Sequence, residues 1–203
     1  MILVICAVLD ELDGFAQPDV DVVAVGVGPV ESALGTCAAL AAKPYALAIN
    51  AGIAGGFAGR APIGSAVAVT SERYLELGRE DGGAIDLPPG LRLETTCESD
   101  PGLLDRYRAR KPEVVFGSGL TSATITTSAA RAARLAQLFD PTAESMEGFA
   151  VLRAAALAGV AAIELRGISN IVADPIGQWD FRAGSAAAIR ALGDFLDVVK
   201  LTA

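Results

Sequence analysis

The strongest constraint on the fold is the alternation of short apolar β-rich runs with glycine-containing turns and helical segments. The first three such runs occupy residues 2–8, 21–27 and 45–50, and an alanine-rich segment at 31–42 separates the last two. Continuous apolar runs of this length are typical of parallel strands that are buried on both faces. The alternation therefore predicts an α/β fold in which helices cover both sides of a central, mainly parallel sheet.

The rest of the chain continues this alternation. The patterns predict further strands at 63–71, 113–116 and 161–168, a strand or its exit loop at 120–127, and helices at 101–110, 128–139, 151–157 and 184–201. Residues 72–99 differ, because they are polar and contain a Gly-Gly pair and a Pro-Pro pair. This segment is interpreted either as a surface excursion that carries substrate specificity or as a long loop.

The length of the chain bounds its domain organisation. With 203 residues and 52% hydrophobic content, it is long enough for one well-filled core. We therefore expect a single domain over 1–203, with an excursion at about 72–99. Its expected architecture is a three-layer α/β/α arrangement around a mixed, mainly parallel sheet.

The composition excludes several classes of function. A net charge of −8 without a dense Lys/Arg cluster argues against nucleic acid or an anionic membrane as partner and leaves a small molecule. No histidine occurs, which excludes Ser-His-Asp and Cys-His catalysis and histidine metal sites. Cys6, Cys37 and Cys97 form no Cys-x-x-Cys pair and are expected to be small buried hydrophobes.

The sequence also bears on location. No Lys or Arg precedes Lys43, so the positively charged start of a secretory signal is missing, and we expect a cytoplasmic protein. Apolar stretches such as 154–163 are shorter than the ~20 residues that cross a bilayer. They are interpreted as buried helix and strand.

Three polar side chains stand where strands end or helices begin. Glu11 follows the first apolar run, and Asn170 follows the run at 161–168. Glu147 comes two residues after Ser145, a good N-cap for the apolar segment that follows, so its carboxylate would face the positive end of a helix. Open α/β sheets place their chemistry at strand ends, but Glu147 taken alone is better explained as a residue that tunes the helix end.

Glycines follow two of the expected strands. Residues 26–28 give only Gly-Val-Gly, without the third glycine of a dinucleotide fingerprint, and no Gly-Lys-Ser/Thr phosphate loop occurs. The run Asn-Ala-Gly-Ile-Ala-Gly-Gly at 50–56 is more informative, because its glycines let the backbone approach a flat ligand and present its amides. A tight strand exit without a ligand explains the same run, so both interpretations stay open.

Five segments, taken in order, resemble the nucleoside phosphorylase and nucleosidase superfamily. This superfamily includes purine and uridine phosphorylases, methylthioadenosine/S-adenosylhomocysteine nucleosidases and futalosine hydrolases. The segments are Ala-Val-Leu-Asp-Glu at 7–11, Val-Gly-Val-Gly at 25–28, the glycine run at 50–56, Ser-Met-Glu-Gly-Phe-Ala at 145–150 and Arg-Gly-Ile-Ser-Asn at 166–170. Each is weak alone, but together they are specific and span nearly the whole chain. The resemblance implies a nucleoside phosphorylase-like fold and a homo-oligomer.

The resemblance also implies roles for individual residues. Glu147 matches the glutamate that holds the ribose 2′- and 3′-hydroxyls, and Met146 the methionine that packs against the sugar. Thr124 and Ile125 match a segment whose backbone binds the base edge, although Thr124 replaces a stacking aromatic that is common there. The other expected substrate contacts lie on the loop beside the base or in the last motif: Ile53, Ala54, Gly55 and Ser169.

The missing cations favour hydrolysis over phosphorolysis. Phosphorylases hold the attacking phosphate with cations, usually arginines near the early glycine loop. Residues 24–36 contain no Lys or Arg, and Glu31 would repel phosphate. Glu11 matches the glutamate that activates water in the nucleosidases. Arg60 lies near a candidate loop, but it is interpreted as a solvated surface charge.

Asn170 decides which base is expected. Nucleosidases that cleave adenine compounds resemble this chain but carry an Asp here, which protonates N7 and accepts from the 6-amino group. An Asn amide instead offers two N–H donors, which suit O6 and N7 of a 6-oxopurine. A mispaired buried polar group costs ~1–3 kcal/mol, about tenfold or more in discrimination. The leaving base is therefore expected to be hypoxanthine.

The Ile-Ser-Asn ending, the Glu-Ser-Met-Glu-Gly run and a downstream tryptophan resemble the futalosine hydrolase branch of the superfamily. This implies hydrolysis of futalosine to hypoxanthine and dehypoxanthine futalosine in the alternative menaquinone pathway, without a metal or redox cofactor. Trp179, with Phe181, would cover the carboxyphenyl tail of the substrate, or would simply pack as a half-buried residue. Arg73, Tyr74 and Arg79 would meet the carboxylate of that tail.

In the implied mechanism, Glu147 stabilises a cationic sugar, Glu11 takes the proton from water and Asn170 stabilises the departing base. Arg166 either orients Glu11 or pins the strand end, and we favour the second. Three alternatives stay open: an adenine-type nucleosidase acting on methylthioadenosine, S-adenosylhomocysteine or aminofutalosine, a 6-oxopurine nucleoside phosphorylase, and a non-catalytic nucleoside-binding protein. The last would keep Glu147 and Asn170 but would not need Glu11.

Overall fold

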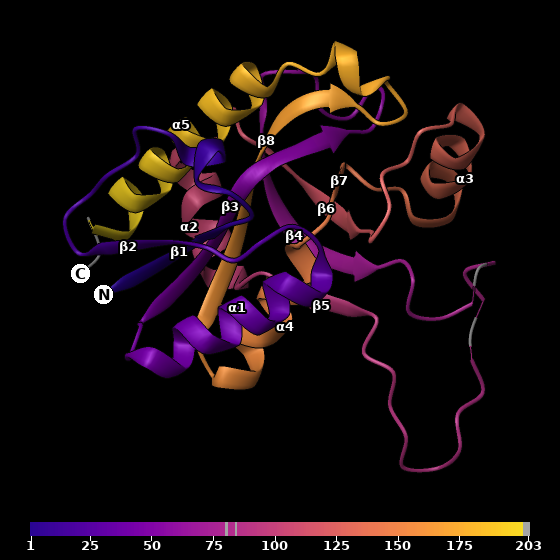
Figure 1. Ribbon diagram of the computed structural model, residues 1–203, viewed down its shortest axis with the longest axis horizontal. Coiled ribbons are helices and arrows are strands. Elements are labelled where there is room, and N and C mark those ends of the chain that lie inside the picture. The colour runs from indigo at the N-terminus through magenta and orange to yellow at the C-terminus, as the bar shows by residue number, and fades with distance from the viewer. Residues whose placement is uncertain (80, 84, 201–203) are drawn as a thin grey trace.

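The computed structural model describes residues 1–79, 81–83 and 85–200. Figure 1 shows a central sheet with helices on both of its sides. The strands are β1 (Ile2–Cys6), β2 (Val20–Ala24), β3 (Leu47–Gly56), β4 (Ala66–Tyr74), β5 (Thr96–Glu98), β6 (Val115–Thr121), β7 (Ala143–Ser145) and β8 (Ala161–Ile171). The helices are α1 (Pro29–Ala42), α2 (Pro101–Arg110), α3 (Ala129–Phe139), α4 (Gly148–Ala158) and α5 (Phe181–Lys200), with short 3₁₀ turns η1 (Leu9–Leu12) and η2 (Ile176–Gln178).

The sheet is mixed and closes partly on itself. Its strands run in the order β2-β1-β3-β7-β6-β4-β5, and β8 pairs with both β3 and β4. Because β8 is parallel to β3 and antiparallel to β4, the strands β3, β8, β4, β6 and β7 form a closed ring of hydrogen-bonded neighbours. Most of the described pairings are parallel, which confirms the expected sheet. The ring closure was not predicted.

Helices bury both faces of the sheet. In Figure 1, α1 and α4 cover one face, and α2 and α5 cover the other. Alternate residues of β1 point to opposite faces, so that Leu3 packs towards α4 and Val4 towards α5. The hydrophobic core between the sheet and α5 contains Phe195, and the core between the sheet and α4 contains Val151. Both side chains are fully buried. The prediction of helices on both sides is confirmed.

Several strands end elsewhere than expected. The strand expected at 45–50 continues to Gly56 as β3, so the glycine run lies within a strand and not in a loop after it. Its glycines keep ladder partners on β8, with a register shift between Ala54 and Gly55. Conversely, β1 stops at Cys6, two residues before the end of the apolar run at 2–8. Strand β2 stops at Ala24, three residues before the end of the run at 21–27.

The excursion is shorter than predicted. Residues 72–74 belong to β4, and 96–98 form β5, which pairs antiparallel with β4. Glu72 is only 1% exposed and is therefore no part of a surface excursion. The described residues between 75 and 95 form neither helix nor strand, while 80 and 84 lie outside the described residues. The prediction of buried cysteines is correct for Cys6, but Cys97 is half-buried and Cys37 is exposed.

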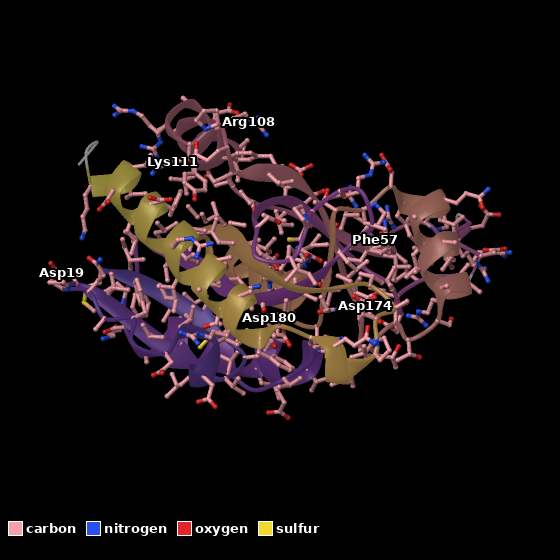
Figure 2. The ribbon with its side chains drawn as sticks, turned by 90° about the horizontal axis from the view of Figure 1, so that it is seen from above. Asp19, Phe57, Arg108, Lys111, Asp174 and Asp180 are labelled. Atoms are coloured by element: carbon pink, nitrogen blue, oxygen red, sulfur yellow. The ribbon has the colours of Figure 1, made fainter. Side chains whose placement is uncertain are left out.

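Polar side chains cap the N-termini of α3 and α5. Ser128 accepts from the Arg131 N–H at 3.3 Å and caps α3 as predicted. Asp180 accepts from the Ala183 N–H at 2.8 Å where α5 begins, beside β8, and is labelled in Figure 2. The last residue of the helix expected at 184–201 lies outside the described part of the chain. No described helix is long and apolar enough to span a membrane.

Candidate active site

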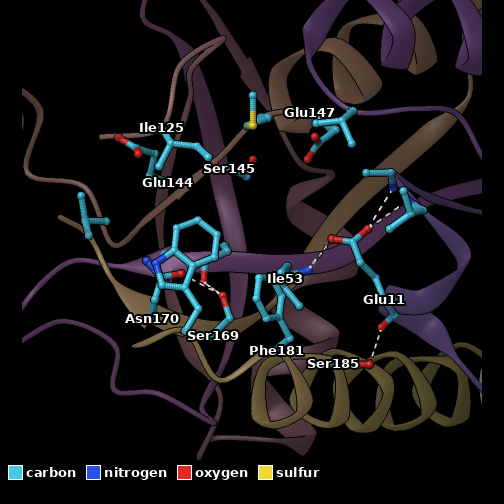
Figure 3. Close-up of a pocket in the computed structure, with 18 of the residues that line it drawn as sticks. Glu11, Ile53, Ile125, Glu144, Ser145, Glu147, Ser169, Asn170, Phe181 and Ser185 are labelled. Carbon is cyan, nitrogen blue, oxygen red and sulfur yellow. Dashed lines mark hydrogen bonds between the residues drawn. The ribbon is translucent and has the colours of Figure 1, made fainter. Parts of the chain in front are cut away.

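A cavity of about 510 Å³ opens where β1, β3 and β8 reach their C-terminal ends (Figure 3). The turn η1, the exit from β6, the β7–α4 junction and the start of α5 complete its wall. The lining residues are Ala7, Val8, Asp10, Glu11, Val27, Ile53, Ala54, Gly55, Ile125, Thr126, Glu144, Ser145, Met146, Glu147, Ser169, Asn170, Val172, Trp179, Phe181 and Ser185. Strand ends therefore carry the site, as expected for an α/β protein.

Glu11 is held in η1 by backbone donors. Its Oε2 atom accepts from the N–H of Ala7 at 3.0 Å and of Val8 at 3.4 Å, and Oε1 accepts from the N–H of Ile53 at 3.0 Å. Burial raises the pKa of Glu11, while the charge of Arg166 and the backbone donors oppose the rise. A fixed carboxylate with a raised pKa is a suitable proton acceptor for water.

Glu147 is itself the N-cap of α4, so the helix begins two residues later than the predicted N-cap Ser145 implied. Its side chain does not cap the helix and instead turns into the site. Oε1 accepts from the Gly28 N–H at 3.1 Å, and Oε2 lies 3.4 Å from Nη2 of Arg166. Gly28 has a φ of 91°, which disfavours any side chain, so the Gly-Val-Gly turn serves to present this N–H. The predicted N-cap, Ser145, accepts from the Gly148 N–H at 3.4 Å.

Asn170 is oriented by its neighbours on β8. The Ser169 hydroxyl donates to Oδ1 at 2.8 Å, and Nδ2 donates to the carbonyl oxygen of Ile171 at 3.1 Å. This leaves one N–H of the amide for a ligand. A Cβ at Gly55 would lie 3.1 Å from Nδ2, so glycine on β3 leaves room for the amide.

Arg166 on β8 is buried beside the site. It is 1% exposed and contacts Glu164, Glu147 and the carbonyl oxygen of Ile53. A Cβ at Gly52 would lie 2.8 Å from Oε1 of Glu11 and 2.9 Å from Nη1 of Arg166. The guanidinium therefore stands between the two catalytic candidates Glu11 and Glu147. Its ion pairs are with Glu147 and Glu164, so the choice between orienting Glu11 and pinning the strand end stays a prediction.

The structure brings nearly all of the predicted substrate contacts to the cavity wall. These are Ile53, Ala54, Gly55, Ile125, Met146, Ser169 and Trp179. Thr124 is the exception: it is exposed, does not line the cavity, and accepts at its carbonyl oxygen from the Ser122 hydroxyl at 2.7 Å. The backbone turns outward before Ile125, which removes Thr124 from the wall.

The two aromatic residues expected at the substrate tail lie together. Trp179 and Phe181 pack with ring centroids 5.6 Å apart, and the indole N–H donates to the Asp174 carbonyl oxygen at 3.1 Å. Arg73, Tyr74 and Arg79 instead line a separate cavity of about 400 Å³, so the expectation that they meet the tail is not supported. Phe139 lies under the Arg73 guanidinium at 5.1 Å.

Glu144 lines the cavity, although no role was predicted for it. Glu144 accepts from the N–H and hydroxyl of Thr126 at 3.0 and 2.6 Å, and burial raises its pKa. In the sheet it pairs with Gly55, which pairs on its other side with Asn170. The signal was available, because Glu144 opens the Glu-Ser-Met-Glu-Gly run that was assigned to the site.

The charge of the cavity is wholly acidic. None of its described lining residues is Lys or Arg, and Arg60 forms an exposed ion pair with Asp140 as the predicted surface charge. Among the described residues, no group of three or more carboxylate or thiol side chains is arranged to hold a metal ion. The wall offers acceptors, backbone amides and one side-chain amide, which suit a neutral hydroxylated ligand more than an anion.

Comparison with known proteins places this geometry in a family. The family model of the Phosphorylase superfamily matches residues 15–200. Futalosine hydrolase of Streptomyces coelicolor is 40% identical over 83% of this chain and 74% of its own length, and that of Thermus thermophilus is 33% identical over 82% and 76%.

Solved structures agree at the level of the fold. Futalosine hydrolase of Helicobacter pylori gives a TM-score of 0.83 with 17% identity, covering 97% of each chain. A methylthioadenosine/S-adenosylhomocysteine nucleosidase of Colwellia psychrerythraea, in complex with adenine, gives 0.82 with 19% identity over 97% and 94%. The chain thus belongs to the phosphorylase superfamily and, within it, to the futalosine hydrolase family of N-glycosyl hydrolases.

Proposed function

We propose that this enzyme hydrolyses the N-glycosidic bond of futalosine and releases hypoxanthine and dehypoxanthine futalosine, in the menaquinone pathway. One observation carries the proposal: Glu11, Glu147 and Asn170 line a single cavity whose described wall contains no Lys or Arg. The names of the relatives support the substrate.

In the proposed reaction, the hydroxyl group of one water molecule is added to the sugar and a proton is added to the base. The bond between C1′ and the purine nitrogen breaks first and leaves positive charge on the ribose ring, which the Glu147 carboxylate stabilises while it accepts from the 2′- and 3′-hydroxyls. Water then bonds to C1′, and Glu11 takes its proton. Asn170 donates to the departing hypoxanthine, which gains a proton on leaving. No metal or redox cofactor enters these steps.

The cavity wall supports hydrolysis over phosphorolysis. A phosphate beside C1′ would need cationic partners, and the described lining supplies three glutamates and an aspartate but no cation. Arg166 lies behind the wall and is already paired with Glu164 and Glu147. Water, which is neutral, is the better nucleophile for this environment.

Asn170 supports a 6-oxopurine over adenine. Its Oδ1 already accepts from Ser169, so the amide faces the cavity through Nδ2, a donor. Oxygen at purine C6 accepts from such a donor, whereas the 6-amino group of adenine would face it with another donor. The adenine-type nucleosidase is therefore the second candidate, and the enzyme's base preference decides between them.

The test is an incubation of the purified protein with futalosine, inosine and methylthioadenosine, each with and without phosphate, followed by measurement of the free base. Hypoxanthine from futalosine without phosphate is expected. Cleavage of inosine only with phosphate would instead identify a phosphorylase, and adenine release would identify the adenine-type enzyme. Binding of a nucleoside without release of its base would identify a non-catalytic nucleoside-binding protein. A cytoplasmic location and a homo-oligomer belong to the proposal and are checked by fractionation and light scattering.

A further inference from the structure

A buried carboxyl pair lies behind the cavity and is not part of its lining. Glu164 on β8 is fully buried, and Glu72 on β4 is 1% exposed. Glu164 accepts from Nε of Arg166 at 2.7 Å, and Glu72 accepts from the Thr121 hydroxyl at 2.7 Å. Glutamate is almost never fully buried unless it is paired, and a buried carboxylate is costly, so this pair requires a reason.

Two glycines make room for the pair. A Cβ at Gly148, the first residue of α4, would lie 2.5 Å from Oε2 of Glu164 and 2.6 Å from Cδ of Glu72. A Cβ at Gly119 on β6 would overlap with Oε1 of Glu72. The fold thus leaves a space that only these two carboxyl groups fill.

The two carboxyl groups lie side by side, because both approach the same point above Gly148. Oε2 of Glu164 finds no N–H or hydroxyl donor among the described residues, so a proton on the neighbouring carboxyl group would give it a partner. Burial and the charge of Glu164 raise the pKa of Glu72 well above its ordinary value. Burial also raises the pKa of Glu164, but the charge of Arg166 opposes this rise. A proton on Glu72, donated to an ionised Glu164 that pairs with Arg166, is the arrangement that fits these contacts.

This proton sets the charge around Arg166. The guanidinium faces Glu164 on its own strand, Glu147 at the start of α4 and Glu11 in η1. With Glu72 neutral, Glu164 offsets the positive charge of Arg166 and the charge of Glu147 remains uncompensated. Without Glu164, Arg166 would neutralise Glu147, which the proposed reaction needs as an anion beside a cationic sugar.

We infer that Glu164 is a positioning residue for catalysis, with protonated Glu72 fixed behind it. It holds the Arg166 guanidinium in place and offsets its charge. The carboxylates of Glu147 and Glu11 thereby keep their negative charge towards the sugar and the water. This inference rests on the proposed function, because it assigns the pair to the same reaction.

The first test is Glu164→Gln, which keeps an acceptor for Nε of Arg166 but removes the charge. Arg166 then lowers the pKa of Glu11 further, so the acid limb of the kcat/KM profile for hypoxanthine release shifts to lower pH, and kcat falls about three- to tenfold. Glu98→Gln, an exposed glutamate of β5, is the control and keeps the wild-type profile. A folded Glu164→Gln enzyme with an unchanged acid limb would overturn the inference.

The second test needs no substrate and locates the proton directly. Infrared spectra of protein with ¹³C-labelled glutamate should show a protonated carboxyl group at neutral pH that disappears in Glu72→Gln. This variant keeps the wild-type acid limb, because the glutamine amide donates to Glu164 in place of the acid. A protonated signal that persists in Glu72→Gln, or none in the wild type, would overturn the assignment. Since this readout is independent of turnover, it still decides whether Glu72 is protonated if Glu164→Gln does not fold or if futalosine is not cleaved.

Discussion

The Oε1 atom of Glu11 accepts a hydrogen bond of 3.0 Å from the backbone N–H of Ile53, a residue 42 positions away in the chain. This contact ties η1 to the middle of β3, while Oε2 accepts from the end of β1. The Ser185 hydroxyl donates to the backbone carbonyl oxygen of Glu11 at 2.7 Å and joins α5 to the same turn. Three elements therefore fix one carboxylate at the cavity wall.

Glu11→Gln is expected to lower kcat roughly 100- to 10,000-fold, the usual range for loss of a general base. Glutamine keeps the size and most hydrogen bonds of the side chain, so the affinity for futalosine should change little. Trp179 is the only tryptophan in the chain and lines the cavity, so its fluorescence reports binding. Asp13→Asn, an exposed acid next to η1, is the matched control. An active Glu11→Gln enzyme would remove Glu11 as the base.

Activity should be lost on the acid side at a higher pH than an ordinary glutamate would allow. Burial raises the pKa of Glu11, and a base acts only when ionised, so kcat/KM rises with pH through this raised pKa and is lost below it. Glu144 also lines the cavity and also has a raised pKa through burial. The pH profile of the Glu144→Gln variant tells which of the two glutamates titrates. If Glu11 is the base, this variant keeps the acid limb of the wild-type profile. If the limb vanishes in that variant, Glu144 is the titrating group.

Asn170→Asp should move the preference from hypoxanthine nucleosides towards adenine nucleosides by about tenfold or more, the effect of ~1–3 kcal/mol from one mispaired buried polar group. The measurement is the ratio of kcat/KM for futalosine and for methylthioadenosine. Ser169→Ala tests the orientation of the amide, since it removes the donor to Oδ1, lets the amide turn and should reduce the preference for futalosine. An unchanged ratio in Asn170→Asp would mean that another residue selects the base.

The strands and helices followed from the sequence because each depends on local pattern, whereas the meeting of Glu11, Glu147 and Asn170 at one wall was implied by the resemblance. Apolar runs mark strands, and parallel strands present their ends on the same side. The chemical roles of the three residues stay predictions.

Long-range pairing could not be predicted in the same way. The closed ring depends on β8 meeting β4, and no local periodicity records that contact. Glu72 stands in a polar Thr-Ser-Glu-Arg run and looks exposed, but it is buried because Glu164 and Thr121, far away in sequence, surround it. Thr124 was placed by resemblance, which carries over sequence position but not the direction in which the backbone turns.

Two glycines in helices should respond in opposite ways to alanine. A Cβ at Gly193 in α5 would meet no described atom within 4 Å, so Gly193→Ala should stabilise the protein by about 0.5–1 kcal/mol through the helix preference of alanine. Gly148→Ala places a methyl group 2.5 Å from Glu164, so it should destabilise by about 1–3 kcal/mol through overpacking and through the displaced carboxyl pair. Urea unfolding of both variants and the wild type measures the two effects. Equal stabilisation by both would show that the space around Glu72 and Glu164 is loose, which would contradict the close fit of the carboxyl pair against α4.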